Sequence, residues 1–387
     1  MGYNAAMELQ IITAIDSVEA DEWNQVAGTA QPFLRHEFLA ALERHGCVGE
    51  QYGWLPHHLL ARDEEGQLIG AVPLYLKDNS YGEFVFDWAW ADAFHRHGIP
   101  YYPKAVSSIP YTPATGPRLL VRPGVEHAPV AVALVELGKA LMEQEGLSSL
   151  HWLFTDAVDN RLLQEQGFLP RLGCQFHWHN QGYRDFEDFL SRLNSRKRKQ
   201  LRRERRHVRD AGIELRILHG HEMDHELWSI MHGFYRSTFE KKSGIPTLSQ
   251  GFFEELSHTM GHQLVLVFAW HQGAPVAGAI NFRGDDTLYG RHWGCREDFH
   301  SLHFEACYYQ GIEYCIAQGL QRFEPGAQGE HKISRGFLPT ATWSTHWIRD
   351  EGFRTAIGDF LRREQYGMRD YMETLAEQSP YRQVEVA

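Results

Sequence analysis

The sequence has 387 residues, of which 43% are hydrophobic and 23% charged, and these proportions are typical of a globular protein. The length is too great for one ordinary hydrophobic core and favours two domains. No apolar run approaches the roughly 20 residues of a membrane-spanning helix, and residues 1–8 lack the features of a signal peptide, so we expect a cytoplasmic protein with no membrane span. The net charge of −12 argues against general affinity for nucleic acid, and we expect no DNA partner.

The first half of the chain alternates between strand-like and helix-like apolar patterns. Residues 99–118 are dense in Pro, Tyr, Thr and Gly, which predicts a structured loop. We expect strands at 9–14, 57–62, 67–76, 83–90, 150–154 and 168–179, and helices at 17–27, 33–44, 128–144 and 159–166.

A similar order of elements returns in the second half, since residues 59–71 and 266–279 share a pattern of strand, glycine-containing turn and strand. We expect strands at 213–218, 263–270, 275–283, 288–294 and 321–324, and helices at 186–193, 225–241, 250–258, 304–317 and 349–378. The repeat predicts an α/β (α+β) protein of two tandem lobes, each a mixed, mostly antiparallel sheet flanked by helices. The expected bounds are 1–180 and 181–348, followed by a C-terminal helix within 349–387 that can pack back on the first lobe.

A basic segment precedes the first strand of the second lobe. Residues 192–209 contain ten Lys or Arg residues against one acid, Glu204. Apolar residues recur there only every seven or eight positions, so a helix would touch the body along one line and leave most of its circumference cationic. Arginine forks suit phosphate oxygens, and we take Arg198 and Arg202 as candidates for binding a nucleotide, coenzyme or tRNA phosphate. The alternative is a charged helix that is merely solvated.

Residues 322–339 combine glycine and proline with charged and aromatic side chains, a mixture that suits a binding loop better than a core. Glu330, His331, Lys332 and Arg335 supply an acid, a titratable imidazole and two cations within six positions of this loop. The candidates for substrate binding in this loop are Gln328, Gly329 and Arg335. A solvated surface hairpin is the alternative.

A second group of candidates surrounds an aromatic segment of the first lobe. Asp87 and Asp92 lie among aromatic residues, and Lys104 follows Tyr101-Tyr102-Pro103. The two carboxylates could hold an ammonium group of an acceptor. The alternative is an aromatic strand packed under a loop.

Several familiar motifs are absent or out of context. No Walker A, G-x-S-x-G or G-x-G-x-x-G motif lies in its required setting. Residues 221–225 read H-E-x-x-H, but no nearby spacing indicates a third ligand and the chain has 23 histidines, so we predict no metal site. The five cysteines are scattered without a C-x-x-C motif, and we expect free thiols.

Together these features resemble the FemAB-like branch of the GNAT acyltransferase superfamily over nearly the whole chain. The resemblance rests on the tandem lobes, the basic helix, the hairpin with Gly273 and Val276-Ala277-Gly278, and the motif Glu324-Pro325-Gly326 … Gly329-Glu330-His331-Lys332 … Arg335-Gly336-Phe337. It is greatest to bacterial proteins labelled as peptidoglycan biosynthesis or recognition proteins. Characterised relatives transfer an amino acid from aminoacyl-tRNA to an amino group of a peptidoglycan precursor, and their lysine near the acyl group matches Lys332.

The resemblance implies an N-acyltransferase that moves an acyl or aminoacyl group to an amine of a small or cell-wall-precursor acceptor. Such a reaction needs a group that stabilises an oxyanion and a group that accepts a proton. We take Lys332 for the first role and Glu330, His331 or Asp87 for the second. No tightly bound cofactor is implied. The donor would be acyl-CoA or aminoacyl-tRNA, so tRNA is one candidate partner. Residues 296–304 lack the glycine-spaced loop by which ordinary acetyltransferases hold coenzyme A, and the coiled-coil arm of some tRNA-using relatives is missing too, so both donors stay open. The alternative function is a non-catalytic binder of peptidoglycan precursors or other phosphorylated ligands.

Overall fold

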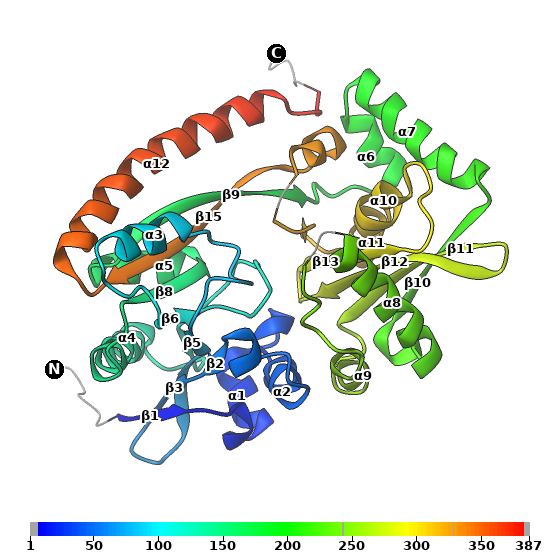
Figure 1. Cartoon of the computed structure of the whole chain (residues 1–387). Coiled ribbons are helices and arrows are strands. Elements are labelled where there is room, and N and C mark those ends of the chain that lie inside the picture. Colours follow the sequence, from blue (N-terminus) through cyan, green and yellow to red (C-terminus); the bar gives the residue numbers. More distant parts are fainter. Residues whose placement is uncertain (1–6, 242–243, 328, 383–387) are drawn as a thin grey trace. The chain divides into compact units, whose positions relative to one another are not determined.

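The computed structural model describes residues 7–241, 244–327 and 329–382 (Figure 1). The chain divides into two compact units: unit 1 comprises residues 1–173 and 341–370, and unit 2 comprises residues 174–340 and 371–387. The chain passes between the units within β9 (Leu169–His179), β15 (Leu338–Ile348) and α12 (Glu351–Glu377). The sequence predicted the bounds 1–180 and 181–348. Residues 174–180 instead belong to unit 2, and residues 341–348 belong to unit 1.

Unit 1 contains a four-stranded antiparallel sheet with the order β1-β3-β4-β7. Its strands are β1 (Glu8–Ile12), β3 (His58–Arg62), β4 (Leu68–Val72) and β7 (Leu120–Val121), with α1 (Ala20–Ala27) and α2 (His36–Arg44) between the first two. Helix α4 (His127–Gln144) packs on β3 and β4. Gly70 permits this approach, because a Cβ atom there would lie 2.4 Å from the side chain of Val130.

A second sheet of unit 1 has the order β15-β8-β6-β5-β2. In addition to β15, this sheet contains β2 (Leu55–Pro56), β5 (Leu74–Lys77), β6 (Lys104–Ser107) and β8 (Ser149–Thr155). The other helices of unit 1 include α3 (Trp88–Arg96) and α5 (Ala157–Glu165). Strands β6 and β8 run parallel, and α4 lies between them in the chain. Helix α5 begins after Asp156, whose carboxylate accepts hydrogen bonds from the amides of Val158 and Asp159.

Unit 2 is built on the strand order β10-β11-β12-β13-β14-β9. The strands are β10 (Ile213–His219), β11 (Leu264–His271), β12 (Ala274–Arg283), β13 (Thr287–Cys295) and β14 (Arg322–Glu324). The helices are α6 (Phe186–Arg192), α7 (Ser195–Asp210), α8 (His225–Lys241), α9 (Gln250–Thr259), α10 (Leu302–Phe304), the π-helix η5 (Glu305–Tyr309) and α11 (Gln310–Gln318).

Helices cover both faces of this sheet. Successive side chains of a strand point to opposite faces. Gly278 of β12 faces α8, since a Cβ atom there would lie 2.5 Å from Met231, whereas Ala279 packs with Ala306 of η5. The sheet therefore has α8 on one face and η5 on the other, while β14 packs against α11.

The two units repeat one arrangement, in which a helical crossover joins two parallel strands at the side of an antiparallel sheet. In unit 1 the crossover is β6-α4-β8, and in unit 2 it is β13-α11-β14. The expected mixed α/β fold, with mostly antiparallel sheets flanked by helices, is confirmed. None of the described helices is long and apolar enough to cross a membrane.

Two local predictions were wrong, and one strand was not predicted. Residues 83–87 form a loop before α3, instead of the strand expected at 83–90, because Glu83 and Asp87 both accept hydrogen bonds from the buried Lys104. The expected loop at 99–118 contains strand β6. Strand β15 was not predicted, because residues 322–339 were interpreted as a loop and no element was assigned to residues 340–348.

Candidate functional site

The glycine-rich stretch 322–339 begins where two parallel strands of unit 2 separate. Strands β13 and β14 pair only from Thr287 and Arg322 to Tyr289 and Glu324. Beyond that point β13 continues along β12 to residue 295, while β14 ends and the chain turns at Pro325. A parallel pair that separates in this way leaves main-chain groups of the longer strand without a strand partner on that side, which suits ligand binding.

Lys332 lies in the short helix η6 (Glu330–Arg335) that follows this turn. It is only 2% exposed, and its Nζ donates a 2.7 Å hydrogen bond to the carbonyl oxygen of Gly326. Burial lowers the pKa of Lys332 to about 8, with a smaller opposing effect of Cys307. The ammonium group therefore loses its proton much closer to neutral pH than an exposed lysine does.

His331 contacts the π-helix η5 next to Lys332. Its Nε2 lies 2.9 Å from the hydroxyl oxygen of Tyr308. Partial burial and the charges of Arg335 and Lys332 lower the pKa of His331, so the ring is neutral at neutral pH. A π-helix is rare and frequently marks a functional site, and η5 supplies the residues beside both His331 and Lys332.

Arg335 is buried and holds η6 to helix α7. Its Nη2 donates to Oε1 of Glu204 at 2.9 Å, and its Nη1 donates to the carbonyl oxygen of His331 at 2.7 Å. The hydroxyl of Tyr309 also donates to Glu204. The guanidinium group, 3.4 Å from the ring centre of Phe304, is thus occupied by protein groups. These contacts indicate that Arg335 positions η6 against α7.

Two buried polar residues of β9, Gln175 and His177, were not found from the sequence, and Glu324 was found only as part of the loop motif. Phe323 of β14 pairs with Trp178 of β9, which brings Glu324 next to His177; Oε1 of Glu324 lies 4.0 Å from Nδ1 of His177. Nε2 of His177 lies 3.1 Å from Oε1 of Gln175. Burial, with contributions from Arg322, His179 and Lys332, lowers the pKa of His177 to about 3, so this ring is neutral. Alternating polar residues in an otherwise apolar strand were the available signal.

The remaining unit 2 candidates lie on the surface or half-buried. Glu330 is exposed, and one of its carboxylate oxygens accepts a 2.6 Å hydrogen bond from the hydroxyl of Tyr371. Arg198 is half-buried on α7, and the exposed Arg202 forms an ion pair with Glu187. Gln328 lies outside the described residues.

Gly329 has a φ of 119°, and a Cβ atom there would lie 2.5 Å from the His331 ring, so glycine is required before η6. The structure brings Gly329, Glu330, His331, Lys332 and Arg335 together because they share one turn and one short helix.

The unit 1 candidates form a separate buried cluster. Nζ of Lys104 donates to Oδ2 of Asp87 at 2.5 Å and to Oε2 of Glu83 at 2.8 Å. Although burial opposes it, the charge of Lys104 lowers the pKa of Asp87 to about 2, which makes this carboxylate a poor proton acceptor. Burial raises the pKa of Glu83 to about 7. Asp92 lies apart on the surface of α3 and pairs with Arg96 at 3.1 Å.

The model of the FemAB-like family, described as peptidoglycan biosynthesis/recognition, matches residues 14–383. No curated protein matches the sequence. Among solved structures, FemX is 12% identical, with a TM-score of 0.51 over 91% of this chain and 100% of FemX. The C-terminal domain of a putative lysylphosphatidylglycerol synthetase from Agrobacterium fabrum is 6% identical, with a TM-score of 0.54 over 90% and 95% of the two chains. A tandem GNAT protein from the clavulanic acid pathway is 12% identical, with a TM-score of 0.44 over 89% and 98%.

Proposed function

Because the chain belongs to the FemAB-like family of peptidoglycan biosynthesis and recognition proteins, we propose that it transfers an acyl or aminoacyl group to an amine of a peptidoglycan precursor. The observation that carries this proposal is Lys332, a buried lysine with a pKa lowered to about 8 at the point where β13 and β14 separate. Lysines with strongly perturbed pKa values are concentrated at functional sites.

In the proposed reaction the free amine attacks the carbonyl carbon of the donor. A C–N bond forms, and the C–O bond of an aminoacyl ester or the C–S bond of an acyl thioester breaks. The carbonyl oxygen carries negative charge in between, and the Lys332 ammonium group would stabilise it. The hydrogen bond to Gly326 fixes Nζ through one of its three protons and leaves the other two available for an oxyanion.

His331 would accept the proton that the ammonium group of the acceptor must lose before the free amine attacks. Its pKa is lowered, so the ring is a base at neutral pH, and the contact of Nε2 with Tyr308 leaves Nδ1 for the incoming proton. Glu330 stays the alternative base, although Tyr371 already donates to its carboxylate. The released alcohol or thiol takes up a proton, from histidine or from water.

Lys332 is buried and bonded to Gly326, so a donor oxygen reaches Nζ only if the turn at Gly326 moves. Gly326 and Gly329, both at positive φ, give this turn its backbone freedom. The Arg335–Glu204 pair holds the other end of η6 to α7, so the turn can move without displacing the helix that carries Lys332.

The proposal is tested by incubating the full chain with UDP-linked muramyl peptides and one donor at a time, either acyl-CoA or aminoacyl-tRNA. Mass spectrometry of the acceptor would show the added acyl or aminoacyl mass. Precursor binding without transfer from any donor would instead support the non-catalytic binder.

A further inference from the structure

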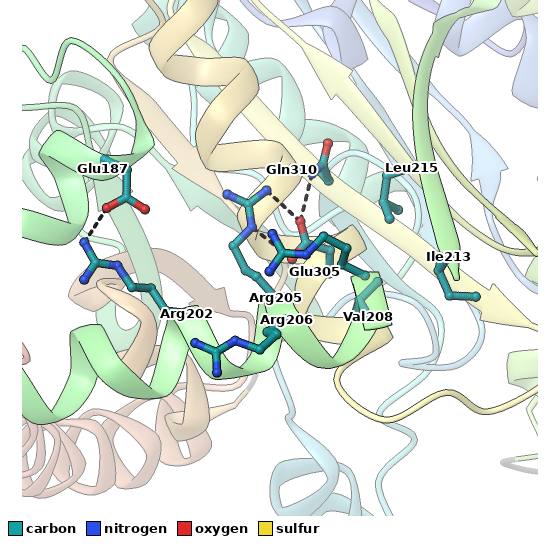
Figure 2. Close-up of a pocket in the computed structure, with 10 residues that line it drawn as sticks. Glu187, Arg202, Arg205, Arg206, Val208, Ile213, Leu215, Glu305 and Gln310 are labelled. Atoms are coloured by element: carbon teal, nitrogen blue, oxygen red, sulfur yellow. Dashed lines mark hydrogen bonds and ion pairs between the residues drawn. The ribbon is translucent and has the colours of Figure 1, made fainter. Parts of the chain in front are cut away.

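A cavity of about 500 Å³ lies in unit 2 between α7, β10 and η5 (Figure 2). Its size is within the range of small-molecule sites, roughly 300–1,000 Å³. Four arginines of α7 line it: Arg202, Arg205, Arg206 and Arg209. Arg202, a candidate for phosphate binding from the sequence, lines it, but none of the residues given a step in the proposed reaction does, so the inference does not rest on the proposed function.

Two of the four arginines are neutralised by neighbouring carboxylates. Arg202 pairs with Glu187, and Arg205 pairs with Glu305 at 3.0 Å (Figure 2). Arg205 also pairs with Glu313 at 2.8 Å. Arg206 and Arg209 are exposed, and within the described part of the chain no carboxylate lies within ion-pair distance of either. The cavity therefore presents two uncompensated guanidinium groups.

The two acids in the wall, Glu187 and Glu305, do not cancel them, because each is paired with another arginine. Glu305 is 3% exposed, and its Oε1 accepts a 2.8 Å hydrogen bond from Gln310 in addition to its contacts with Arg205. A carboxylate that is already paired and hydrogen-bonded opposes an incoming anion much less than a free one would. The wall as a whole favours a ligand with two negative charges.

Another part of the cavity is apolar. Val208, Ile213 and Leu215 line it, and Figure 2 shows them on one side of the group, away from Arg202 and its partner Glu187. Val208 and Ile213 are buried, while Leu215 on β10 is half-exposed and offers a hydrocarbon surface. Inorganic phosphate would use only the cationic part, whereas an organic phosphate would use both parts.

We propose that this cavity binds an organic phosphate, with the phosphate at Arg206 and Arg209 and an apolar carbon body against Leu215. Arg196, Lys199 and Arg203, which are exposed on the same helix and have no recorded acidic partner among the described residues, extend the positive field. On a protein of net charge −12 such a local field concentrates anions at one place. A phosphate monoester and a diphosphate ester are both compatible with it.

The test measures binding of n-hexyl phosphate, n-hexyl diphosphate, inorganic phosphate and n-hexanol to the full chain by titration calorimetry. We expect n-hexyl phosphate or its diphosphate to bind at least about 10-fold more tightly than inorganic phosphate, since each buried methylene adds affinity. Arg206→Gln/Arg209→Gln should weaken that binding at least about 10-fold, because the charged hydrogen bonds are lost. Leu215→Thr should reduce the advantage of the hexyl group and leave inorganic phosphate unaffected.

The matched control is Arg196→Gln/Lys199→Gln, which removes the same charge from the same helix outside the cavity. We expect it to weaken n-hexyl phosphate binding less than about 3-fold, through the long-range field alone. The proposal would be overturned if the two double variants weakened the binding of n-hexyl phosphate equally. It would also be overturned if the natural chain bound the hexyl compounds no more tightly than inorganic phosphate. A third outcome would overturn it as well: an RNA hairpin binds more tightly than the hexyl compounds, and both double variants weaken its binding equally. The exposed face of α7 would then be an RNA-binding surface.

Discussion

The ammonium group of Lys332 donates a hydrogen bond to the carbonyl oxygen of Gly326 at 2.7 Å, across the turn that follows β14. The two residues are six positions apart, and the contact buries a charged group at the end of a strand. A buried lysine costs folding free energy at neutral pH, so its presence calls for a function.

The first prediction concerns stability. The pKa of Lys332 is about 8 in the folded chain and 10.5 when unperturbed, so the unfolded chain binds more protons between these values and stability rises with pH there. Lys332→Met removes a cost of about 3 kcal/mol at neutral pH, against about 1 kcal/mol for the lost hydrogen bond. We expect the variant to be the more stable protein at neutral pH and to lose that advantage by pH 10.5, as measured by urea unfolding. A variant destabilised equally at both pH values would show that the lysine is a structural partner.

The second prediction concerns the pH dependence of transfer. Lys332 acts as a cation, so kcat/KM should fall as pH rises through about 8. Lys332→Arg keeps the positive charge at all pH values and should move this alkaline limb upward by at least about one pH unit. His331→Gln should lower kcat and remove the acidic limb, which lies below the unperturbed value of 6.5. If the alkaline limb of the kcat/KM profile does not move in Lys332→Arg, a group other than Lys332 causes it.

The third prediction concerns the buried ion pair between η6 and α7. Arg335→Met leaves Glu204 buried beside Tyr309 and should cost about 3–5 kcal/mol of unfolding free energy. Adding Glu204→Leu should recover much of that loss, because no uncompensated charge then remains. The control Arg96→Gln, in an exposed pair with Asp92, should change stability by less than about 1 kcal/mol. Additive losses in the double variant would contradict the pairing.

The fourth prediction concerns the acid Glu83 beside Lys104 in unit 1. Burial raises its pKa from 4.5 to about 7, so the folded chain binds more protons and Glu83 makes stability fall as pH rises between these values. Glu83→Gln keeps the shape and an acceptor for Lys104 but does not titrate. Its stability relative to the natural chain should therefore increase from pH 4.5 to pH 7, measured by urea unfolding. A difference that is constant with pH would contradict the raised pKa.

Much of the fold could be predicted because its signals are local. Strand and helix periodicities, the turn with Gly273 and the repeat of a hairpin along the chain all lie within short windows, and they gave the mixed α/β class. The strand expected at 83–90 failed for a non-local reason. Lys104 draws Glu83 and Asp87 into a buried cluster, and this tertiary interaction outweighs the strand propensity of the aromatic residues.

The candidate site was predicted in part. Its glycine and lysine motif is contiguous, so Lys332 and its neighbours could be found from the sequence. The contact of Arg335 with Glu204, 131 positions away, could not, and neither could the meeting of His177 with Glu324 across two strands. Ion pairs on α7 could not be predicted for the same reason. The sequence shows ten Lys or Arg residues at 192–209, but only the structure shows that carboxylates pair with Arg202 and Arg205.

The central claim is tested most directly by measuring kcat of the natural chain and of Lys332→Met on samples whose unfolding midpoints are also measured. The acceptor is a UDP-linked muramyl peptide, and the donor is whichever of acyl-CoA and aminoacyl-tRNA supports transfer. We expect turnover to fall by about 10²-fold or more while the unfolding midpoint at neutral pH stays equal or rises, because Lys332 stabilises an oxyanion and not the fold. Unchanged turnover in a stable Lys332→Met protein would remove Lys332 from the reaction and contradict the account.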